Sequence, residues 1–231
     1  MQIKYSLILP CYNELENLKL LIPQLLGKLK NKDFEILIVD DNSQDQTIKN
    51  IKKKYYKNKR IKYILRKKKP SLGLSIKDGL LKSRGQSIIV MDTDFNHRPS
   101  DLKRMLLIYE KNEYDIISGS RFLKGGYSSS NFRHYSSLFF NFFINFIING
   151  KLTDNFSGFF IIKKKLIINE LNNIFYGYGE YYIRLLFYLQ KNRMAIKEIS
   201  VKYGKRKYGV SKSKLIKMMF TYTYHAIKLL I

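Results

Sequence analysis

Short apolar runs alternate with helical patterns through the first 120 residues, and no other feature constrains the fold as strongly. An uninterrupted apolar run is typical of a strand buried on both faces, and such strands separated by helices indicate a parallel sheet covered on both sides. The predicted strands span residues 6–9, 34–39, 61–65, 87–91 and 114–118, and the predicted helices span 15–29, 45–56, 72–83 and 101–111. The sequence therefore predicts an α/β domain.

The second half of the chain carries a different pattern. A loop rich in glycine and serine over 121–131 leads into a predicted helix over 133–150. A short strand at 157–162 follows, and then helices at 179–190 and 211–230 with a strand at 195–202 between them. No internal repeat or low-complexity linker separates the two halves, so we expect one domain over 1–231.

The net charge is strongly positive. The 231 residues include 43 Lys and Arg against 18 Asp and Glu, which gives +25. Such a surface attracts anions, whether nucleic acid, anionic lipid or phosphorylated substrates. An A/T-rich coding bias is the alternative explanation, because the excess is mostly Lys and accompanies many Ile, Asn, Tyr and Phe residues.

Cysteine content and hydropathy bear on the location of the protein. Cys11 is the only cysteine, so no internal disulfide can form, which fits a reducing cytoplasm. The N-terminus is predicted to begin a strand rather than a signal peptide, and no run reaches the roughly 18 apolar residues of a membrane span. We therefore expect a cytoplasmic protein without a membrane-spanning helix.

Asp92 and Asp94 follow the apolar run 87–91. Residues two apart on an extended strand point to the same side, so the two carboxylates would meet on one face. Like charges repel and push one carboxyl toward its neutral form. A divalent cation relieves that repulsion, and Mg²⁺ typically takes one or two carboxylates together with substrate phosphates. The alternative is a polar loop after a strand.

Three polar clusters follow predicted strands, at residues 10–14, 40–43 and 92–94. The carboxyl ends of parallel strands meet at one edge of a sheet, and ligands of such sheets bind beyond that edge. The sequence therefore predicts a ligand site where the three clusters meet.

Six short motifs follow one another along the chain. They are Pro10-Cys11-Tyr12-Asn13-Glu14, Val39-Asp40-Asp41-Asn42-Ser43, Asp92-Thr93-Asp94, Gly119-Ser120-Arg121, Asp154-Asn155-Phe156-Ser157-Gly158-Phe159 and Arg206-Lys207-Tyr208-Gly209-Val210-Ser211-Lys212. In these motifs and their order, over about residues 3–215, the chain resembles the family 2 glycosyltransferases, and within that family the dolichyl- or polyprenyl-phosphate mannosyltransferases. The resemblance implies a GT-A fold, which is a Rossmann-like, mostly parallel sheet with helices on both faces. Residues 1–119 would form the nucleotide-binding half and 120–231 the acceptor- and membrane-facing half, with amphipathic or interfacial C-terminal helices.

The resemblance also implies roles for individual residues. The nucleotide-sugar donor would be bound by Pro10, Tyr12, Asn13, Glu14, Asp40, Asp41, Asp92, Arg206 and Lys212. Mg²⁺ or Mn²⁺ would be held by Asp92, Asp94 and Asn96, and the acceptor phosphate by Arg121, Arg133 and Ser137. The expected catalytic residues are Asp94, Arg121 and Arg133. Asp154, Ser157 and Gly158 are expected to form a tight turn near the donor.

Several of these positions have plainer alternatives. Glu14 and Asp41 precede predicted helices, where an acidic residue can act as a cap. Asn96 is one methylene shorter than the Gln that the family often carries there, so it could bind the cation directly or through water. His97 is expected at the surface or behind the metal ligands, because a hard oxygen-ligated cation does not need it.

The helix predicted over 133–150 is apolar over most of its circumference. Arg133, Ser137, Asn141, Asn145 and Asn149 recur every four residues and form one polar stripe. The helix is therefore either buried or placed in a membrane interface, and we favour the interface, where flanking basic residues can meet anionic lipid. Arg133 and Ser137 would then face the active site. Residues 218–231 could add a second membrane contact or an oligomer surface.

These features lead to one functional expectation with three alternatives. We expect a metal-dependent inverting glycosyltransferase that moves a hexose, mannose from GDP-mannose, onto a polyprenyl phosphate at the cytoplasmic face of a membrane, with a membrane-anchoring partner or a second copy as possible protein partners. The first alternative is a UDP-sugar donor with a saccharide or glycolipid acceptor in polysaccharide synthesis. The second is a nucleic-acid-binding protein, against which the absence of a recognisable binding signature argues. The third is a catalytically silent membrane-associated partner.

Overall fold

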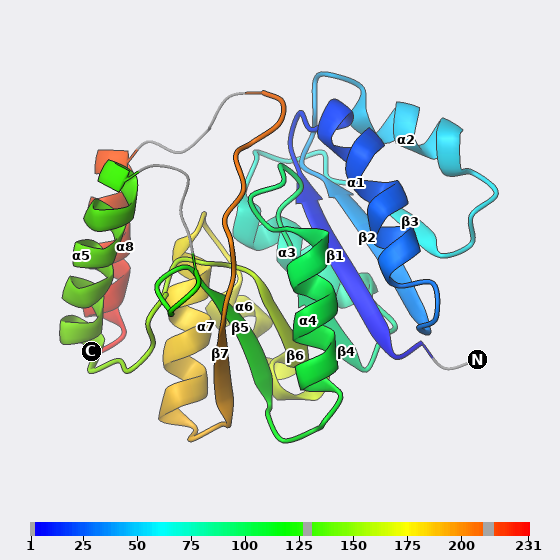
Figure 1. The fold of residues 1–231 in the computed structure, drawn as a ribbon. Coiled ribbons are helices and arrows are strands. Elements are labelled where there is room, and N and C mark those ends of the chain that lie inside the picture. The colour runs from blue at the N-terminus through cyan, green and yellow to red at the C-terminus, as the bar shows by residue number, and fades with distance from the viewer. Residues whose placement is uncertain (1–2, 127–130, 210–214) are drawn as a thin grey trace.

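The computed structural model describes residues 3–126, 131–209 and 215–231. Within these ranges one seven-stranded sheet has the order β3-β2-β1-β4-β6-β5-β7 (Figure 1). The strands are β1 (Tyr5–Cys11), β2 (Phe34–Asp40), β3 (Ile61–Leu65), β4 (Ser87–Val90), β5 (Ile116–Ser120), β6 (Phe160–Lys163) and β7 (Ile196–Ser200). The side chains of 131–133 and 215 lie outside the description.

The predicted mostly parallel sheet is confirmed. β1 pairs in parallel with β2 and β4, β2 with β3, and β5 with β7. β6 is the exception, because it lies between β4 and β5 and runs antiparallel to both. In the register of β1 and β2, Cys11 lies opposite Asp40, so the two strands end level and present their following loops at the same edge.

Helices cover both faces of the sheet. They are α1 (Leu15–Lys28), α2 (Thr47–Tyr55), α3 (Leu72–Lys82), α4 (Pro99–Tyr109), α5 (Asn131–Ile148), α6 (Leu171–Ile174), α7 (Glu180–Lys191) and α8 (Leu215–Lys228), with short 3-10 turns at Lys164–Leu166 and Ile168–Glu170. Apolar side chains of α1, α2 and α4 bury one face, and those of α3, α6 and α7 bury the other. Successive β1 residues serve both cores, with Leu7 and Leu9 on one side and Ile8 on the other. Because both faces of the sheet are buried, the sequences of these strands are continuous apolar runs.

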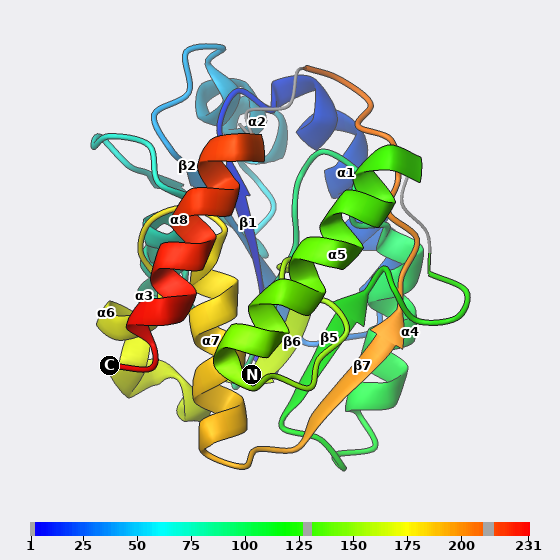
Figure 2. The same cartoon turned by 90° about the vertical axis from the view of Figure 1, so that its left-hand side faces the viewer.

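α5 and α8 pack against each other outside these layers (Figures 1 and 2). They share a small third core with Ile183 of α7, built around Phe140, Ile144, Tyr222 and Ala226. The helix pair therefore rests on the sheet domain through α7.

Several predicted boundaries were wrong. α4 begins at Pro99 instead of 101, because proline has no N–H to lose and its fixed φ suits the first helical position. β5 runs over Ile116–Ser120, two residues later than predicted, and is paired throughout with β7. β6 begins at Phe160 rather than 157, because Gly158 has φ +68 and breaks the extended backbone. The helical turns between 164 and 174 were not predicted.

Candidate functional site

The loops after β1 and β2 are bound to each other at the carboxyl edge of the sheet. The Asn13 side-chain oxygen accepts from the Gln44 amide at 2.7 Å, and the Asn13 amide donates to the Ser43 hydroxyl at 2.8 Å. Asn13 takes a left-handed φ of 54°, a conformation that asparagine tolerates better than most residues. Pro10 is buried in β1 and Tyr12 is half-buried beyond it. The two polar clusters therefore form one surface, as their places in the sequence predicted.

Asp92 and Asp94 form an electrostatically strained pair beside that surface. β4 ends at Val90, so the prediction that strand alternation brings the carboxylates together was wrong in its premise. The two carboxylates are close enough nonetheless for the charge of Asp92 to act on Asp94. Loss of hydration raises the pKa of Asp92 to about 7, although its side chain is 36% exposed. Burial and then the charge of Asp92 raise the pKa of Asp94.

An arginine lies between this pair and the first loop. Arg206 Nη2 contacts Asp94 Oδ2 at 2.6 Å, and Arg206 Nη1 contacts Glu14 Oε1 at 2.8 Å. The two carboxylates are only 7% and 6% exposed, so the guanidinium supplies the positive charge that makes their ionised forms tolerable. Arg206 thus neutralises part of the acidic edge.

The segment that carries Arg206 follows β7 and is held along its length. The Gly204 amide donates to the Asn96 carbonyl at 3.0 Å, and a Cβ added at Gly204 would lie 2.3 Å from the Phe95 carbonyl oxygen. Asn17 of α1 exchanges hydrogen bonds with the backbone of Tyr208 at 3.1 and 3.2 Å. Only a glycine at 204 allows this close approach to the loop after β4.

Glu14 does not act as a helix cap through its side chain. It stands at the N-cap position of α1 but makes no capping hydrogen bond there. Besides Arg206, its carboxylate accepts from Asn17 Nδ2 at 2.6 Å. Asn17 therefore links Glu14 to the backbone of the Arg206 segment.

Asp40 and Asp41 are engaged within the protein. Asp40 accepts from the amides of Ser43 at 2.9 Å and Ile48 at 3.2 Å, which fixes the turn into α2. Asp41 forms a buried ion pair with Arg66 and accepts from the Ser71 amide at 2.5 Å. The alternative that Asp41 caps α2 was wrong. Asp41 instead accepts from Ser71, the residue immediately before α3. Sequence reasoning missed Arg66, although a lone arginine after the strand 61–65 at the same sheet edge was an available signal.

Asn96 and His97 form hydrogen bonds with the two residues of the acidic pair. The backbone and side-chain amides of Asn96 both donate to Asp94 at 3.0 Å. His97 is 1% exposed, so the prediction that it could lie at the surface was wrong. Its Nδ1 accepts from the Asp92 amide at 2.9 Å, and burial lowers the pKa of His97 to about 4, which keeps the ring neutral.

Asp92 and Asp94 suit a hard divalent cation in number and kind. Among the residues that the structure describes, no group of three His, Cys, Asp or Glu side chains gathers at one point. Two carboxylates with space for phosphate oxygens are the usual protein contribution to a Mg²⁺ site that binds a phosphorylated substrate. Arg206 already places a positive charge on one of them. The donor set therefore fits Mg²⁺ or Mn²⁺.

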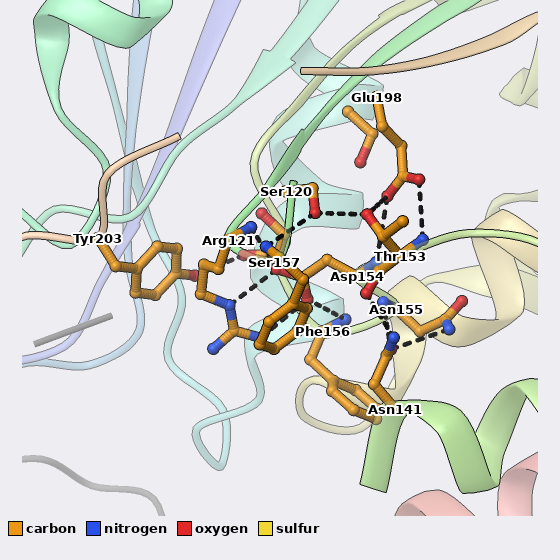
Figure 3. A network of polar contacts seen from close by, with 12 residues as sticks. Ser120, Arg121, Asn141, Thr153, Asp154, Asn155, Phe156, Ser157, Glu198 and Tyr203 are labelled. Carbon is orange, nitrogen blue, oxygen red and sulfur yellow. Dashed lines mark hydrogen bonds and ion pairs between the residues drawn. The ribbon is translucent and has the colours of Figure 1, made fainter. Parts of the chain in front are cut away.

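Arg121 lies near enough to Asp92 for its charge to oppose the rise in the pKa of that carboxyl, and Asp154 binds Arg121 in bidentate fashion (Figure 3). Its Nε contacts Asp154 Oδ2 and its Nη2 contacts Asp154 Oδ1, both at 2.8 Å. The Asp154 side chain is fully buried, and its charge keeps the pKa of Arg121 above the ordinary value although burial opposes this. Nη1 is the guanidinium nitrogen that Asp154 does not engage. Sequence reasoning placed Asp154 in a turn near the donor and missed this pairing.

Of the remaining predicted site residues, Ser137 is fully described, Arg133 is described only in its backbone, and Lys212 is not described. Ser137 is half-buried on α5. Arg133 belongs to the first turns of the same helix, but its side chain lies outside the description. Lys212 falls outside the described residues.

Two residues of the α5 polar stripe, Asn141 and Asn145, face inward. Asn141 is 3% exposed, and its side-chain oxygen accepts from the Asn155 amide at 2.8 Å. Asn145 donates to the Leu152 carbonyl at 2.6 Å. Both asparagines therefore hold the loop 152–155 that carries Asp154.

The outward surface of α5 and α8 is apolar, and we call it the apolar face. Its most exposed residues are Tyr135, Phe139, Phe142 and Phe146 of α5 and Ile216, Phe220 and Tyr224 of α8. Phe142 and Phe146 are 71% and 81% exposed, and Phe220 is 75% exposed. Contiguous exposed apolar side chains of this size mark a surface that contacts a partner or a membrane. Neither helix, nor any other in the described part of the chain, is both long and apolar enough to cross a membrane.

Two proteins named dolichol-phosphate mannosyltransferase are similar in sequence to this chain. The chain is 31% identical over 239 residues to the dolichol-phosphate mannosyltransferase of Pyrococcus furiosus, an alignment that covers 98% of this chain but 64% of the relative. It is 26% identical over 222 residues to the protein of that name from Saccharomyces cerevisiae, covering 92% of this chain and 82% of the relative.

Solved structures share the fold. The glucosyl-3-phosphoglycerate synthase of Mycobacterium tuberculosis, in complex with Mn²⁺, uridine diphosphate and phosphoglyceric acid, superposes with a TM-score of 0.71 at 16% identity, covering 98% of this chain and 78% of that one. The sheet with its covering helices is thus the GT-A fold that the motifs predicted. The sequence model described as "Glycosyl transferase family 2" matches residues 6–170, and the chain belongs to that family.

Proposed function

We propose that this protein is a metal-dependent inverting glycosyltransferase that moves mannose from GDP-mannose to a polyprenyl phosphate at the cytoplasmic face of a membrane. One observation carries the proposal: an acidic pair suited to a cation, Asp92 and Asp94, shares a site with Arg121 in a protein that also exposes the apolar face of α5 and α8. The first feature suits a nucleoside diphosphate, and the last suits a lipid. The names of the archaeal and yeast relatives support this choice of donor sugar and acceptor.

On the donor side, Asp92 and Asp94 would hold Mg²⁺ or Mn²⁺, with Asn96 as a possible further ligand. A divalent cation bound there would neutralise the charge of the departing nucleoside diphosphate. Arg206 would release Asp94 and turn its guanidinium to the diphosphate, whose oxygens match its planar fork. Tyr12, Asn13, Glu14, Asp40, Asp41 and Lys212 are the further donor residues in this proposal, with Pro10 shaping the end of β1.

On the acceptor side, Arg121 and Arg133 would bind the lipid phosphate, with Ser137 as a neutral donor. A phosphate oxygen forms the new bond to the anomeric carbon of the sugar while the bond from that carbon to the diphosphate oxygen breaks. The acceptor is already an anion, so it needs positioning more than deprotonation, and no general base is required. Attack opposite to the leaving group inverts the anomeric centre.

Donor binding in solution tests the first half of the proposal. Thermal unfolding is measured with Mn²⁺ and a panel of GDP- and UDP-sugars. A donor present at 100 times its dissociation constant stabilises the folded state by about 2.7 kcal/mol. We expect the largest shift with GDP-mannose, and a response confined to UDP-sugars would replace the proposed donor. A protein that responds to no sugar nucleotide would contradict the proposed function.

A transfer assay tests the second half. Purified protein is given GDP-mannose, Mn²⁺ and a polyprenyl phosphate in detergent, and the lipid product is measured. Transfer to a saccharide or glycolipid, with none to the lipid phosphate, would overturn the proposed acceptor.

A further inference from the structure

Glu198 of β7 makes three hydrogen bonds to one short stretch of the loop before β6 (Figure 3). Its Oε2 accepts from the Thr153 amide at 2.8 Å, and its Oε1 accepts from the Thr153 hydroxyl at 3.0 Å and from the Asp154 amide at 3.1 Å. A carboxylate is acceptor-only, so it satisfies all three donors at once. The backbone at Asp154 is therefore fixed from the β7 side.

The other side of the same loop is fixed by α5. Asn141 accepts from the amide and the side chain of Asn155, at 2.8 and 3.0 Å. With Glu198 on one side and Asn141 on the other, the Asp154 carboxylate has little freedom to move. It receives Arg121 Nε and Nη2 and also the Arg121 backbone amide, the last at 3.0 Å.

A tyrosine covers the Arg121 guanidinium from a third direction. The Arg121 guanidinium carbon lies 4.8 Å from the centre of the Tyr203 ring. The Tyr203 hydroxyl donates to the Ser157 carbonyl at 2.8 Å and lies 2.8 Å from His97 Nε2, so the ring is held in place too. The guanidinium is thus fixed by the carboxylate of Asp154 and by the ring of Tyr203, and Nη1 points away from the Asp154 fork.

We infer that Glu198 is a positioning residue for the phosphate acceptor: it holds Asp154, and Asp154 holds Arg121 in the orientation that receives the phosphate. The inference rests on the proposed function, because it takes Arg121 as an acceptor ligand. A fixed guanidinium loses less entropy when a phosphate binds than one that must first be ordered. Nothing in the sequence beyond its place in a strand singled out Glu198.

Substitution of Glu198 tests this inference. In Glu198→Gln the side-chain oxygen can keep the hydroxyl and Asp154 contacts, whereas its amide group faces the Thr153 N–H as a second donor. In Glu198→Ala all three contacts are lost. The dissociation constant of farnesyl phosphate, in detergent, is measured by calorimetry alongside that of GDP-mannose with Mn²⁺. We expect farnesyl phosphate to bind on the order of tenfold more weakly to Glu198→Ala, with Glu198→Gln between that variant and the wild type.

Donor binding should stay within about twofold of the wild type in both variants, because Glu198 makes no contact with the acidic pair. Glu113→Gln, at an exposed carboxylate after α4, is the matched control and should change neither constant. Equal weakening of acceptor and donor binding would indicate a general structural role for Glu198 and would overturn the inference.

A double-mutant cycle separates action through Arg121 from action elsewhere. In an Arg121→Ala background, Glu198→Ala should cause no further loss of farnesyl phosphate binding, because its effect passes through the missing guanidinium. Additive losses would overturn the inference. Equal binding of farnesyl phosphate by the wild type and by Glu198→Ala would also overturn it and would leave the proposed function standing. A wild-type protein that binds no isoprenyl phosphate would overturn the proposed acceptor and the inference together.

Discussion

Arg206 and a divalent cation would compete for the same carboxylate. The guanidinium is 2.6 Å from Asp94 and neutralises an anion that burial makes costly. A metal ion at Asp94 would need the guanidinium to leave, and the diphosphate that arrives with the metal offers it a new anionic partner. In the proposed function, Arg206 would thus couple the arrival of the donor to a movement of the segment after β7.

Arg206→Ala should raise the affinity for Mn²⁺ in the absence of donor, by on the order of fivefold, because the competing cation is removed from a partly exposed site. The same substitution should weaken GDP-mannose binding, because the diphosphate loses a ligand. Free Mn²⁺ in a titration followed by electron paramagnetic resonance checks the first effect. Lys205→Ala, at an exposed position in the same segment, is the matched control. Unchanged Mn²⁺ affinity in Arg206→Ala would contradict the competition.

Asp94→Asn should abolish the stabilisation of the protein by GDP-mannose with Mn²⁺, with at least a hundredfold loss of metal affinity. The fold should survive, because the neutral amide removes a buried charge and keeps the size of the side chain. Thermal unfolding with and without Mn²⁺ checks both statements. A variant that still shows a metal-dependent shift of wild-type size would show that Asp94 is not a metal ligand.

The importance of a single residue could be predicted where the neighbouring sequence marked it. It could not be predicted where it depends on a partner far away in the chain. Asp92, Asp94 and Asn13 could be singled out because each lies a few residues after the end of a strand. Asp154 and Arg66 were missed or misassigned, because their importance comes from partners that lie 33 and 25 residues away in the chain. A sequence pattern can place a side chain at an edge, but it does not say which opposite charge it meets there.

α5 combines an inward polar stripe with an outward apolar surface. Asn141 and Asn145 face the loop 152–155, and Phe139, Phe142 and Phe146 are exposed, which reverses the usual arrangement of a surface helix. α5 is therefore not a fully buried helix, and Asn141 and Asn145 of its polar stripe hold the loop 152–155. The helix instead organises the Asp154 loop on one side and presents the apolar face on the other.

Phe142→Ser combined with Phe146→Ser should weaken binding to vesicles that contain anionic phospholipid by at least on the order of tenfold, because both side chains are exposed and would enter the lipid interface. Folding stability should change little. Co-sedimentation with vesicles checks the binding. Leu107→Ser, at a residue of α4 that is 57% exposed, is the matched control and should bind as the wild type does. If the double variant bound vesicles normally but lost self-association, the apolar face would be an interface between copies of the chain.

Asn141→Ala should lower the free energy of unfolding by about 1–3 kcal/mol, because the Asn155 amide is left buried without its acceptor. Denaturant unfolding measures this change. Asn172→Ala, at an exposed residue of α6, should have almost no effect. A loss of similar size at Asn172 would remove the reason for treating the α5 stripe as structural.

At a membrane surface, the charge of the whole molecule would act together with the apolar face. A net charge of +25 attracts anionic phospholipid over a distance, whereas apolar side chains contribute only when they are in direct contact with the lipid. Raising the salt concentration from about 0.1 M to about 1 M shortens the screening length from about 10 Å to about 3 Å. Vesicle binding of the wild type should therefore fall with salt but keep a remainder that depends on Phe142 and Phe146.

The same vesicle assay distinguishes the two contributions. The variant with serines at 142 and 146 should lose most of the binding that persists at high salt. Binding to neutral vesicles should be weak for both proteins at every salt concentration. Equal binding of the wild type to neutral and anionic vesicles would show that the basic composition reflects coding bias rather than membrane attraction.

The sequence by itself determined the α/β architecture, the family and the edge of the sheet at which the polar clusters meet. These depend on local periodicity and on short motifs next to strands, which a linear pattern records. Only the tertiary structure decided that β6 enters the sheet antiparallel, that Arg206 bridges Asp94 and Glu14 across 112 and 192 residues, and that Glu198 holds Asp154 across 44. The physical reason is that an ion pair or a buried hydrogen bond depends on which side chains the packed core brings within about 3 Å, and local sequence does not specify that distance.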